Sequence, residues 1–194
     1  MYDMGVRIVG LAWLSNALAK SNRLDGDTDT GLSDLGKDIV KRGNDLGVIF
    51  DVSHLSDGSF WDLAKLSKKP IIATHSNFRA LCPHSRNLTD DMFRAICASG
   101  GVAGFNLYAD FVGEAPTLDT ACDHLIHMAQ MDPDCRHIAL GGDLDGCDRL
   151  VGGFTGVDCY NLLAEKMRLR GFTDENIMNI FWNNAMGVIS GCCM

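Results

Sequence analysis

The sequence predicts an α/β fold in which helices cover a parallel sheet, and three observations support this prediction. Five short apolar runs have the length of buried strands, and helix-length segments separate them. These runs lack the polar and apolar alternation of half-exposed strands, which is typical of parallel strands buried on both faces. No proline-rich linker or internal repeat divides the 194 residues, so we expect a single domain over residues 1–194.

Each strand is expected where an apolar run is bounded by polar residues or glycine. The expected strands are residues 6–13, 48–54, 70–75, 101–106 and 137–142. The expected helices are residues 33–47, 56–67, a segment that begins at Thr89, and residues 117–131, 157–170 and 173–189. The hydroxyl groups of Ser33, Thr89 and Thr173 can cap three of these helices, and Gly47 can end the first one.

Composition excludes several classes of partner. The net charge of −8 argues against a nucleic-acid surface, and no apolar stretch reaches the roughly 18–20 residues of a membrane span. The first residues lack the basic and apolar regions of a secretory signal. The eight cysteines contain no CxxC pair, so we expect free thiols in a reducing cytoplasm rather than disulfides or a four-cysteine zinc site.

His54 and His75 each follow an expected buried strand, and one helix-length segment lies between the two strands. In such a βαβ unit the strands are parallel neighbours, so both imidazoles emerge at the same edge of the sheet. The alternative is that both are core histidines bonded to backbone carbonyls. Their equivalent positions favour two ligands of a zinc ion, although two ligands alone do not make a site.

Asp143 and Arg86 are the other two candidates. Asp143 ends the last clear strand inside a glycine-rich turn, where it could accept a proton from water at the metal. Alternatively the glycines merely permit positive φ angles, with Asp145 capping the turn. Arg86 lies in the loop after the second histidine strand and could grip a substrate carboxylate with two N–H groups, or it could be a solvated loop arginine.

Other candidate residues carry weaker signals. His84 shares the loop of Arg86, and His124 and His127 lie three apart on a helix that we expect in the outer layer, away from the strand ends. Ser53 and Ser76 flank the two strand-end histidines without a Gly-x-Ser-x-Gly elbow, so serine nucleophile chemistry is unsupported. A phosphate-binding loop is also absent from the sequence.

Four segments together resemble the membrane (renal) dipeptidase family, zinc metallopeptidases on an amidohydrolase-like (β/α)8 barrel. Their order and spacing match, and the similarity runs over about residues 5–189. The segments are Asp51-Val52-Ser53-His54-Leu55-Ser56, Thr74-His75-Ser76-Asn77, Ser85-Arg86-Asn87 and Gly141-Gly142-Asp143-Leu144-Asp145-Gly146.

The resemblance implies a role for each matched position. His54 and His75 resemble ligands of one zinc ion in a two-zinc site, and Arg86 resembles the arginine that holds the free carboxylate of a dipeptide. Asp143 resembles the acid that handles protons as the bridging water attacks the peptide carbonyl. Trp13 stands where the animal enzymes have a histidine that contacts the substrate, so this position departs from the pattern of the animal enzymes.

The family also has a His-x-Asp pair and a bridging glutamate, both upstream of the matched region. No His-x-Asp occurs in this sequence, and its three glutamates all follow His54. A full barrel has eight strands and needs about 250 residues. This sequence has 194 residues and five expected strands. The resemblance therefore implies a partial (β/α)8 TIM-type barrel, roughly its last five βα units, with at most a partial zinc site.

These observations leave three hypotheses. The leading one is zinc-dependent dipeptide hydrolysis that belongs to the complete barrel, with weak or no activity of this chain alone. The second is a catalytically incompetent half-barrel that acts as an interaction protein or pseudo-enzyme, for which we expect a homo-oligomer that shields the open sheet edge. The third is another barrel hydrolase, such as an amidase or deacetylase with a single metal.

Overall fold

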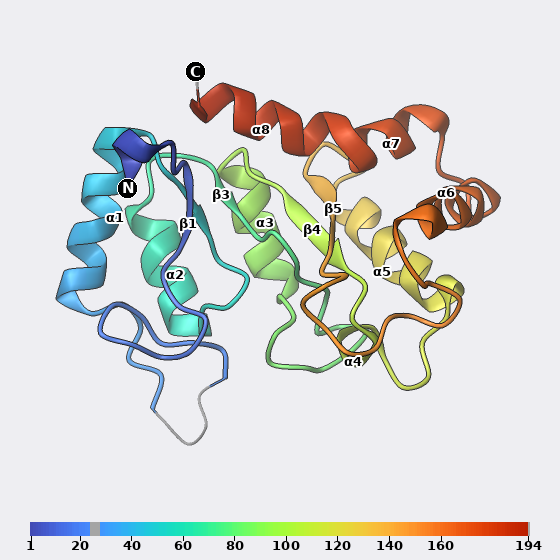
Figure 1. Ribbon diagram of the computed structural model, residues 1–194, viewed down its shortest axis with the longest axis horizontal. Helices are drawn as coiled ribbons and strands as arrows, with labels where there is room; N and C mark the ends of the chain where they lie inside the picture. Colours follow the sequence, from blue (N-terminus) through green and yellow to red (C-terminus); the bar gives the residue numbers. More distant parts are fainter. Residues whose placement is uncertain (24–27, 194) are drawn as a thin grey trace.

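The computed structural model describes residues 1–23 and 28–193 (Figure 1). Strands alternate with helices along the chain. The strands are β1 (Ile8–Gly10), β2 (Ile49–Asp51), β3 (Ile71–Ile72), β4 (Ala103–Asn106) and β5 (Ile138–Gly142). The helices are α1 (Asp34–Leu46), α2 (Asp57–Leu66), α3 (Asp90–Ala98), α4 (Ala109–Val112), α5 (Leu118–Met131), α6 (Tyr160–Leu169), α7 (Asp174–Met178) and α8 (Asn184–Cys193). Short 3₁₀ turns cover Tyr2–Met4 and Val157–Cys159, and a π-helical turn covers Asn179–Asn183.

All of the strand pairs are parallel. Strands β1, β2 and β3 pair in that order, with Ile8 opposite Ile49, and β4 pairs with β5. A parallel bridge between Ala73 and Ala103 joins β3 to β4, so the spatial order of the strands follows the chain from β1 to β5. The predicted α/β class is confirmed, and each regular strand is shorter than its apolar run.

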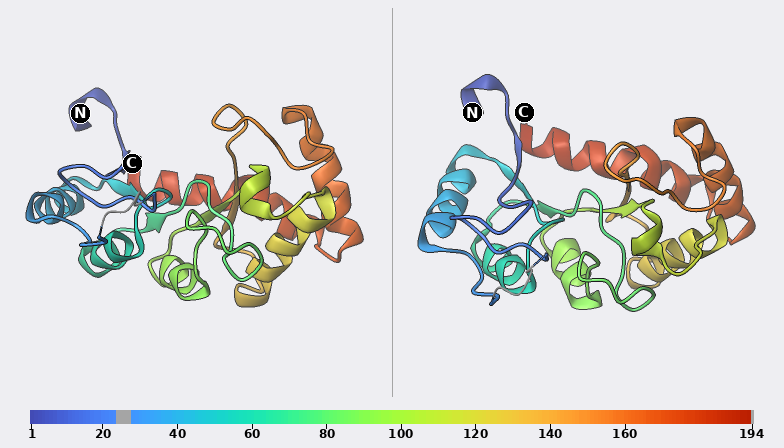
Figure 2. Two further views of the ribbon diagram at one scale, coloured as in Figure 1. Left: turned by 90° about the horizontal axis from the view of Figure 1, so that it is seen from below. Right: turned by 60° about the horizontal axis from the view of Figure 1, so that its bottom comes forward.

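The sheet has two apolar faces because successive strand residues point in opposite directions. Phe50, Ile71 and Ile138 face the main core, which α1, α2, α3 and α5 cover. Their neighbours face the other way and form a small second cluster: Ile49, Ile72, Val102 and Ala139. Ala185 and Val188 of α8 pack against this second cluster. Figure 2 shows the four helices along one side of the strands and α8 on the other.

The helices begin where the sequence predicts because their capping residues are local. The side chains of Ser33, Thr89 and Thr173 each accept a hydrogen bond from the backbone N–H three residues later. Gly47 ends α1 with φ 78°, a left-handed conformation that a residue without a Cβ adopts at little cost.

The structure differs from the prediction at the C-terminal end and in one loop. The helix expected over residues 173–189 is divided by the π-helical turn into α7 and α8. The side chain of Asn184 donates hydrogen bonds to the carbonyl oxygens of Cys135 and Ile138, at 2.6 and 2.7 Å, and so fixes the start of α8 to β5. The short helix α4 was not expected, because four residues carry too little periodicity to predict a helix.

The described cysteine thiols are free: Cys82, Cys97, Cys122, Cys135, Cys147 and Cys159. Cys192 and Cys193 lie outside the residues whose side chains the structure describes. Within the described part of the chain, no helix has both the length and the apolar character needed to cross a bilayer.

Candidate active site

His54 and His75 meet at the carboxyl ends of β2 and β3. Each imidazole stands three residues beyond the last residue of its strand, so parallel pairing of the strands brings the two rings together. Their Nε2 atoms are 3.0 Å apart, and the ring centroids are 5.0 Å apart in an edge-on arrangement. The predicted convergence of the two histidines is therefore present in the structure.

Burial favours the neutral form of both imidazoles. Burial, followed by the positive charge of Arg86 and the neighbouring His75, lowers the pKa of His54 to about 4. Burial also lowers the pKa of His75, although the carboxylate of Asp51 opposes that shift. A neutral imidazole has the free lone pair that a metal ligand needs.

A carboxylate lies behind His75. Asp51 Oδ1 accepts hydrogen bonds from the backbone N–H groups of Ser53 and Thr74, both at 3.0 Å, and from the hydroxyl of Ser53 at 2.7 Å. The hydroxyl of Thr74 donates to Asp51 Oδ2 at 2.7 Å and contacts His75 Nδ1 at 2.7 Å. The carboxylate thus ties the ends of β2 and β3 together directly beneath the histidine pair.

Arg86 is buried beside the same pair, with 4% of its surface exposed. One guanidinium nitrogen donates to the carbonyl oxygen of Ser53, and the other lies 3.5 Å from His54 Nε2. Burial lowers the pKa of Arg86 to about 10, while Asp143 and Asp51 act in the opposite direction. A side chain that still carries its charge at neutral pH is therefore fixed at the centre of the site, and it is not the solvated arginine of the alternative interpretation.

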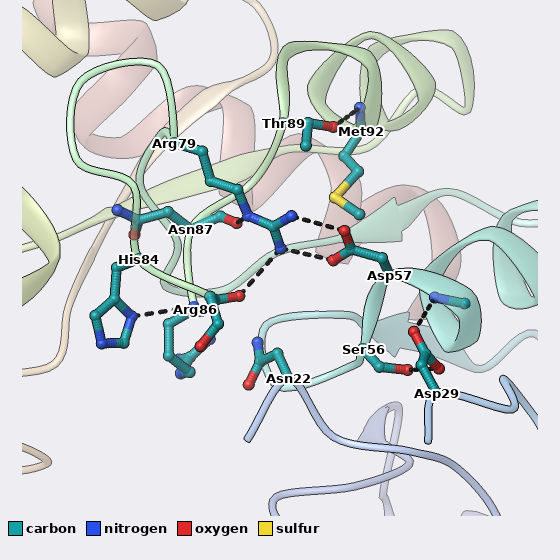
Figure 3. Close-up of polar contacts among 12 residues, drawn as sticks. Asn22, Asp29, Ser56, Asp57, Arg79, His84, Arg86, Asn87, Thr89 and Met92 are labelled. Atoms are coloured by element: carbon teal, nitrogen blue, oxygen red, sulfur yellow. Dashed lines mark hydrogen bonds and ion pairs between the residues drawn. The ribbon is translucent and has the colours of Figure 1, made fainter. Parts of the chain in front are cut away.

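An ion pair anchors the loop that carries Arg86 (Figure 3). The guanidinium of Arg79 donates two hydrogen bonds to the carboxylate of Asp57 at the start of α2, both at 2.6 Å. It also donates to the carbonyl oxygens of Asn87 at 2.7 Å and Ser85 at 3.1 Å, on either side of Arg86. A planar guanidinium makes all four contacts at once, which fixes the loop relative to α2.

Asp143 approaches the site from β5. It follows Gly142 directly, and both residues have positive φ angles, 62° for Asp143 and 65° for Gly142. The side chain of Asn106, at the end of β4, donates a hydrogen bond to Asp143 Oδ2 at 3.1 Å. The positive φ angles of the glycine turn agree with the alternative interpretation given above, and the backbone carbonyl of Asp143 accepts the Gly146 N–H at 3.1 Å within this turn.

A cavity of about 630 Å³ opens over these groups, large enough for a small peptide. Its walls include His54, Arg86 and Asp143 together with the rim residues Trp13 and His84. The Trp13 ring is exposed and lies 6.2 Å from the ring of His54, centroid to centroid. The structure therefore gathers three of the four predicted site residues around one cavity, and the fourth, His75, contacts the ring of His54.

The histidine pair fits two positions of a zinc shell. Two nitrogen ligands at 2.0–2.1 Å from a tetrahedral ion lie about 3.3 Å apart, close to the observed 3.0 Å. His75 Nδ1 is also engaged by a neighbouring hydroxyl, as is usual for a ligating histidine. Across residues 1–23 and 28–193 the structure contains no group of three or more His, Cys, Asp or Glu side chains arranged to hold a metal ion.

The remaining histidine candidates lie elsewhere or play a supporting part. His84 Nδ1 accepts the backbone N–H of Arg86 at 3.1 Å, so this ring helps shape the loop. His124 is buried in the core, where its ring nitrogens contact the N–H of Phe78 at 3.3 Å and the carbonyl oxygen of Val112 at 3.1 Å. His127 contacts Asp90 at 2.9 Å on the outer helical layer.

Sequence reasoning missed Asp51, Thr74 and Asn106 as site residues. Each is a polar residue at the end of a largely apolar strand run, and that signal could have drawn attention to them. Asp51 and Thr74 lie within the motifs of the family resemblance, which implies no role for either residue. Their partners become visible once the register of β2, β3 and β4 is known.

Comparison with known proteins identifies the family. The sequence model of the membrane dipeptidase family (peptidase family M19) matches residues 1–192. The chain belongs to this family. The predicted resemblance is thereby confirmed.

Two curated relatives and one solved structure illustrate the match. An uncharacterised dipeptidase of Schizosaccharomyces pombe is 34% identical over 96% of this chain. An uncharacterised protein encoded in the pqqA 5′ region of Klebsiella pneumoniae is 36% identical over 97% of this chain. A metallopeptidase of Rhodobacter sphaeroides, solved with a phosphinate mimic of the dipeptide L-Ala-D-Ala, superposes with a TM-score of 0.91 at 29% identity over 98% of this chain.

The relatives of the membrane dipeptidase family are longer than the matched region. The chain spans 47% of the S. pombe dipeptidase, 73% of the K. pneumoniae protein and 57% of the R. sphaeroides metallopeptidase. The chain thus spans about half the length of the first of these relatives.

Proposed function

We propose that this chain contributes the proton-handling and carboxylate-binding half of a zinc-dependent dipeptidase site. The observation that carries the proposal is the convergence of His54 and His75, with Nε2 atoms 3.0 Å apart, beside Arg86 and Asp143 in one cavity. Membership of the membrane dipeptidase family supports peptide hydrolysis as the reaction.

In the proposed mechanism the two histidines hold one zinc ion through Nε2. A bound zinc ion polarises the peptide carbonyl and lowers the pKa of water. Arg86 binds the free carboxylate of the dipeptide in this proposal, because it is a buried cationic side chain that lines the cavity. This contact places the scissile bond at a fixed distance from the histidine pair.

Asp143 handles the proton in this proposal. Its carboxylate lines the cavity, and one oxygen is fixed by the amide of Asn106, which leaves the other free to accept a proton from the attacking water. The same carboxyl group can then donate that proton to the leaving amine. Asp143 therefore acts first as a general base and then as a general acid.

We further propose that the five strands are the last five βα units of an eight-unit barrel and that catalysis needs the complete barrel. Two imidazoles fill two positions of a zinc shell, and the printed sequence has no His-x-Asp pair to add more. The parallel strand order β1 to β5 and the superposition on the R. sphaeroides metallopeptidase, with a TM-score of 0.91, support this arrangement.

A chimera tests the proposal. The matched part of the R. sphaeroides metallopeptidase is replaced by this chain, and zinc content and hydrolysis of a dipeptide panel are measured. We expect turnover in the chimera, at least a hundredfold loss of activity with His54→Gln or Asp143→Asn, and little change with the control His137→Gln. His137 contacts the carbonyl oxygen of Gly101 at the end of β5 opposite to Asp143. The control therefore replaces the same type of side chain as His54→Gln, but away from the proposed site.

The isolated chain gives the complementary result. With zinc added, we expect weak or no dipeptidase activity. Turnover comparable to that of the complete R. sphaeroides enzyme would contradict the proposal that catalysis needs the complete barrel.

A non-catalytic role is the second candidate, and the absence of a three-ligand metal group among the described residues favours it. On this proposal the chain is an interaction protein or pseudo-enzyme that buries the open edge of β1 in an oligomer. Light scattering combined with metal analysis separates the two candidates. A stable, metal-free oligomer supports the second candidate. One firmly held zinc ion per chain, with the missing ligands supplied across an interface by another copy, supports the first candidate through catalysis by assembly.

A further inference from the structure

We propose that Asp51 and Thr74 are positioning residues that preset the tautomer of His75, so that its Nε2 lone pair faces the zinc position before any metal arrives. The inference rests on the proposed function in one respect, the role of His75 as a ligand. The proton arrangement itself follows from the contacts of these three residues.

The direction of each hydrogen bond can be derived by counting hydrogens. Asp51 Oδ1 receives three donors, two of them backbone N–H groups, so the carboxylate acts as an acceptor. The Thr74 hydroxyl has a single hydrogen, which it donates to Asp51 Oδ2 at 2.7 Å. Its 2.7 Å contact with His75 Nδ1 can then be a hydrogen bond only if Nδ1 carries the proton.

Ser53 closes the network without changing this count. Its hydroxyl hydrogen goes to Asp51 Oδ1 at 2.7 Å, and its oxygen accepts the backbone N–H of His75 at 3.1 Å. The 3.2 Å contact between the Ser53 and Thr74 hydroxyl oxygens therefore joins two groups that have both donated to Asp51. His75 is fixed through its ring and through its backbone.

The two histidines are consequently not equivalent. Because His75 Nε2 has no hydrogen, the 3.0 Å contact between the rings is a hydrogen bond only if His54 Nε2–H donates it. The Arg86 nitrogen that lies 3.5 Å from His54 Nε2 can only donate, so on this assignment it makes no hydrogen bond to that ring. His54 Nδ1 is then without a hydrogen, which agrees with its being buried with no bonding partner in the described part of the chain. His75 is ready to ligate zinc, whereas His54 must first transfer its proton from Nε2 to Nδ1.

The test uses the full chain labelled with ¹⁵N-histidine and a long-range ¹H–¹⁵N correlation spectrum at pH 7.5, without metal. The signals of His54 and His75 are assigned with His54→Gln and His75→Gln. We expect the Nδ1–H tautomer for His75 and the Nε2–H tautomer for His54. The Nε2–H tautomer at His75 in the unsubstituted chain would overturn the inference.

The variant Asp51→Asn should reverse the tautomer of His75. The three donors favour the amide oxygen at the Oδ1 position, so the amide nitrogen faces Thr74 and donates to its hydroxyl oxygen. The Thr74 hydrogen is then free to point at His75 Nδ1, and His75 should change to the Nε2–H tautomer. Retention of the Nδ1–H tautomer in Asp51→Asn would contradict the relay.

Substitutions of Thr74 provide a second route if Asp51→Asn does not fold. Thr74→Val removes the acceptor and should give His75 a mixture of tautomers, whereas Thr74→Ser should retain Nδ1–H. Ser76→Ala is the matched control, because it removes a buried hydroxyl next to His75 that bonds no described residue. An equal tautomer change in Ser76→Ala and Thr74→Val would show general disturbance and refute a specific role.

A zinc titration of the same spectra links the tautomer to metal binding. We expect the apparent zinc affinity to fall about 10–100-fold in Asp51→Asn and Thr74→Val, and to stay within about threefold in Thr74→Ser. Unchanged affinity in the first two variants would overturn the inference. The tautomer readout needs neither metal nor turnover, so failure of the chimera to hydrolyse dipeptides leaves it intact, and the reverse also holds.

Discussion

Gly141→Ala should damage both the stability of the chain and the geometry of His75. A Cβ at this position would lie 2.1 Å from the carbonyl oxygen of Thr74 and 2.8 Å from the Cα of His75. Ordinary contact begins at 3.4 Å, so the backbone of β5 or of the histidine loop must move by about 1 Å. Both colliding groups are backbone, so no flexible side chain can turn aside.

The expected magnitude follows from the cost of overpacking. Forcing one methyl group into a tightly packed region costs about 1–3 kcal/mol, and we expect Gly141→Ala near the upper end because backbone atoms must shift. Gly187→Ala is the matched control. A Cβ at Gly187 meets no atom within 4 Å, and alanine in an exposed helix position should instead stabilise the chain by about 0.5–1 kcal/mol.

Urea denaturation gives the free energy of unfolding of both variants, and the histidine spectra described above report on His75. The two substitutions should change the unfolding free energy in opposite directions, and the His75 signals should shift in Gly141→Ala alone. A change of less than about 0.5 kcal/mol in Gly141→Ala, with His75 unmoved, would refute the close approach of β5 to the histidine loop.

Three further predictions concern acid stability, thiol reactivity and the Arg86 loop. Burial lowers the pKa of His124 and lowers the pKa of His54 to about 4, so the unfolded chain binds more protons than the folded chain between pH 6.5 and 4. The free energy of unfolding should therefore fall as the pH is lowered through this window. Equal urea midpoints at pH 7 and pH 5 would contradict this prediction. Burial raises the pKa of the Cys97 thiol to about 12, so a thiol reagent at pH 8 should label it slowly in the folded chain and rapidly in urea, and equal rates would refute its burial. Arg79→Lys should lower the free energy of unfolding by about 1 kcal/mol, because an ammonium group cannot reproduce the paired hydrogen bonds to Asp57. The same substitution should speed backbone hydrogen exchange in the loop that carries Arg86. Unchanged exchange would show that another contact holds this loop.

Much of the fold can be read from the sequence because its causes are local. Ser33, Thr89 and Thr173 cap helices within three residues of their own position, and Gly47 ends α1 for a conformational reason that belongs to one residue. The strand-end position of His54 also depends on nothing distant. The resemblance to the membrane dipeptidase family was equally readable, since it lies in short motifs and their spacing.

The register of the sheet decided the contacts between site residues that lie far apart in the sequence. Asp51 and Thr74 are 23 residues apart in the sequence, and the donor that fixes Asp143 comes from Asn106, 37 residues away. Parallel neighbours meet only when their strands align, and a shift of one residue would turn each side chain to the opposite face.

By itself, then, the sequence determined the α/β class, most helix ends and the strand-end placement of the two histidines, because propensity, capping and apolar runs act over a few residues. Only the tertiary structure decided that Arg86 is buried against Ser53, that Arg79 anchors its loop to Asp57 and that α8 covers the second sheet face. Those contacts exist because chain segments far apart in sequence pack together, and no local pattern of residues encodes such distances.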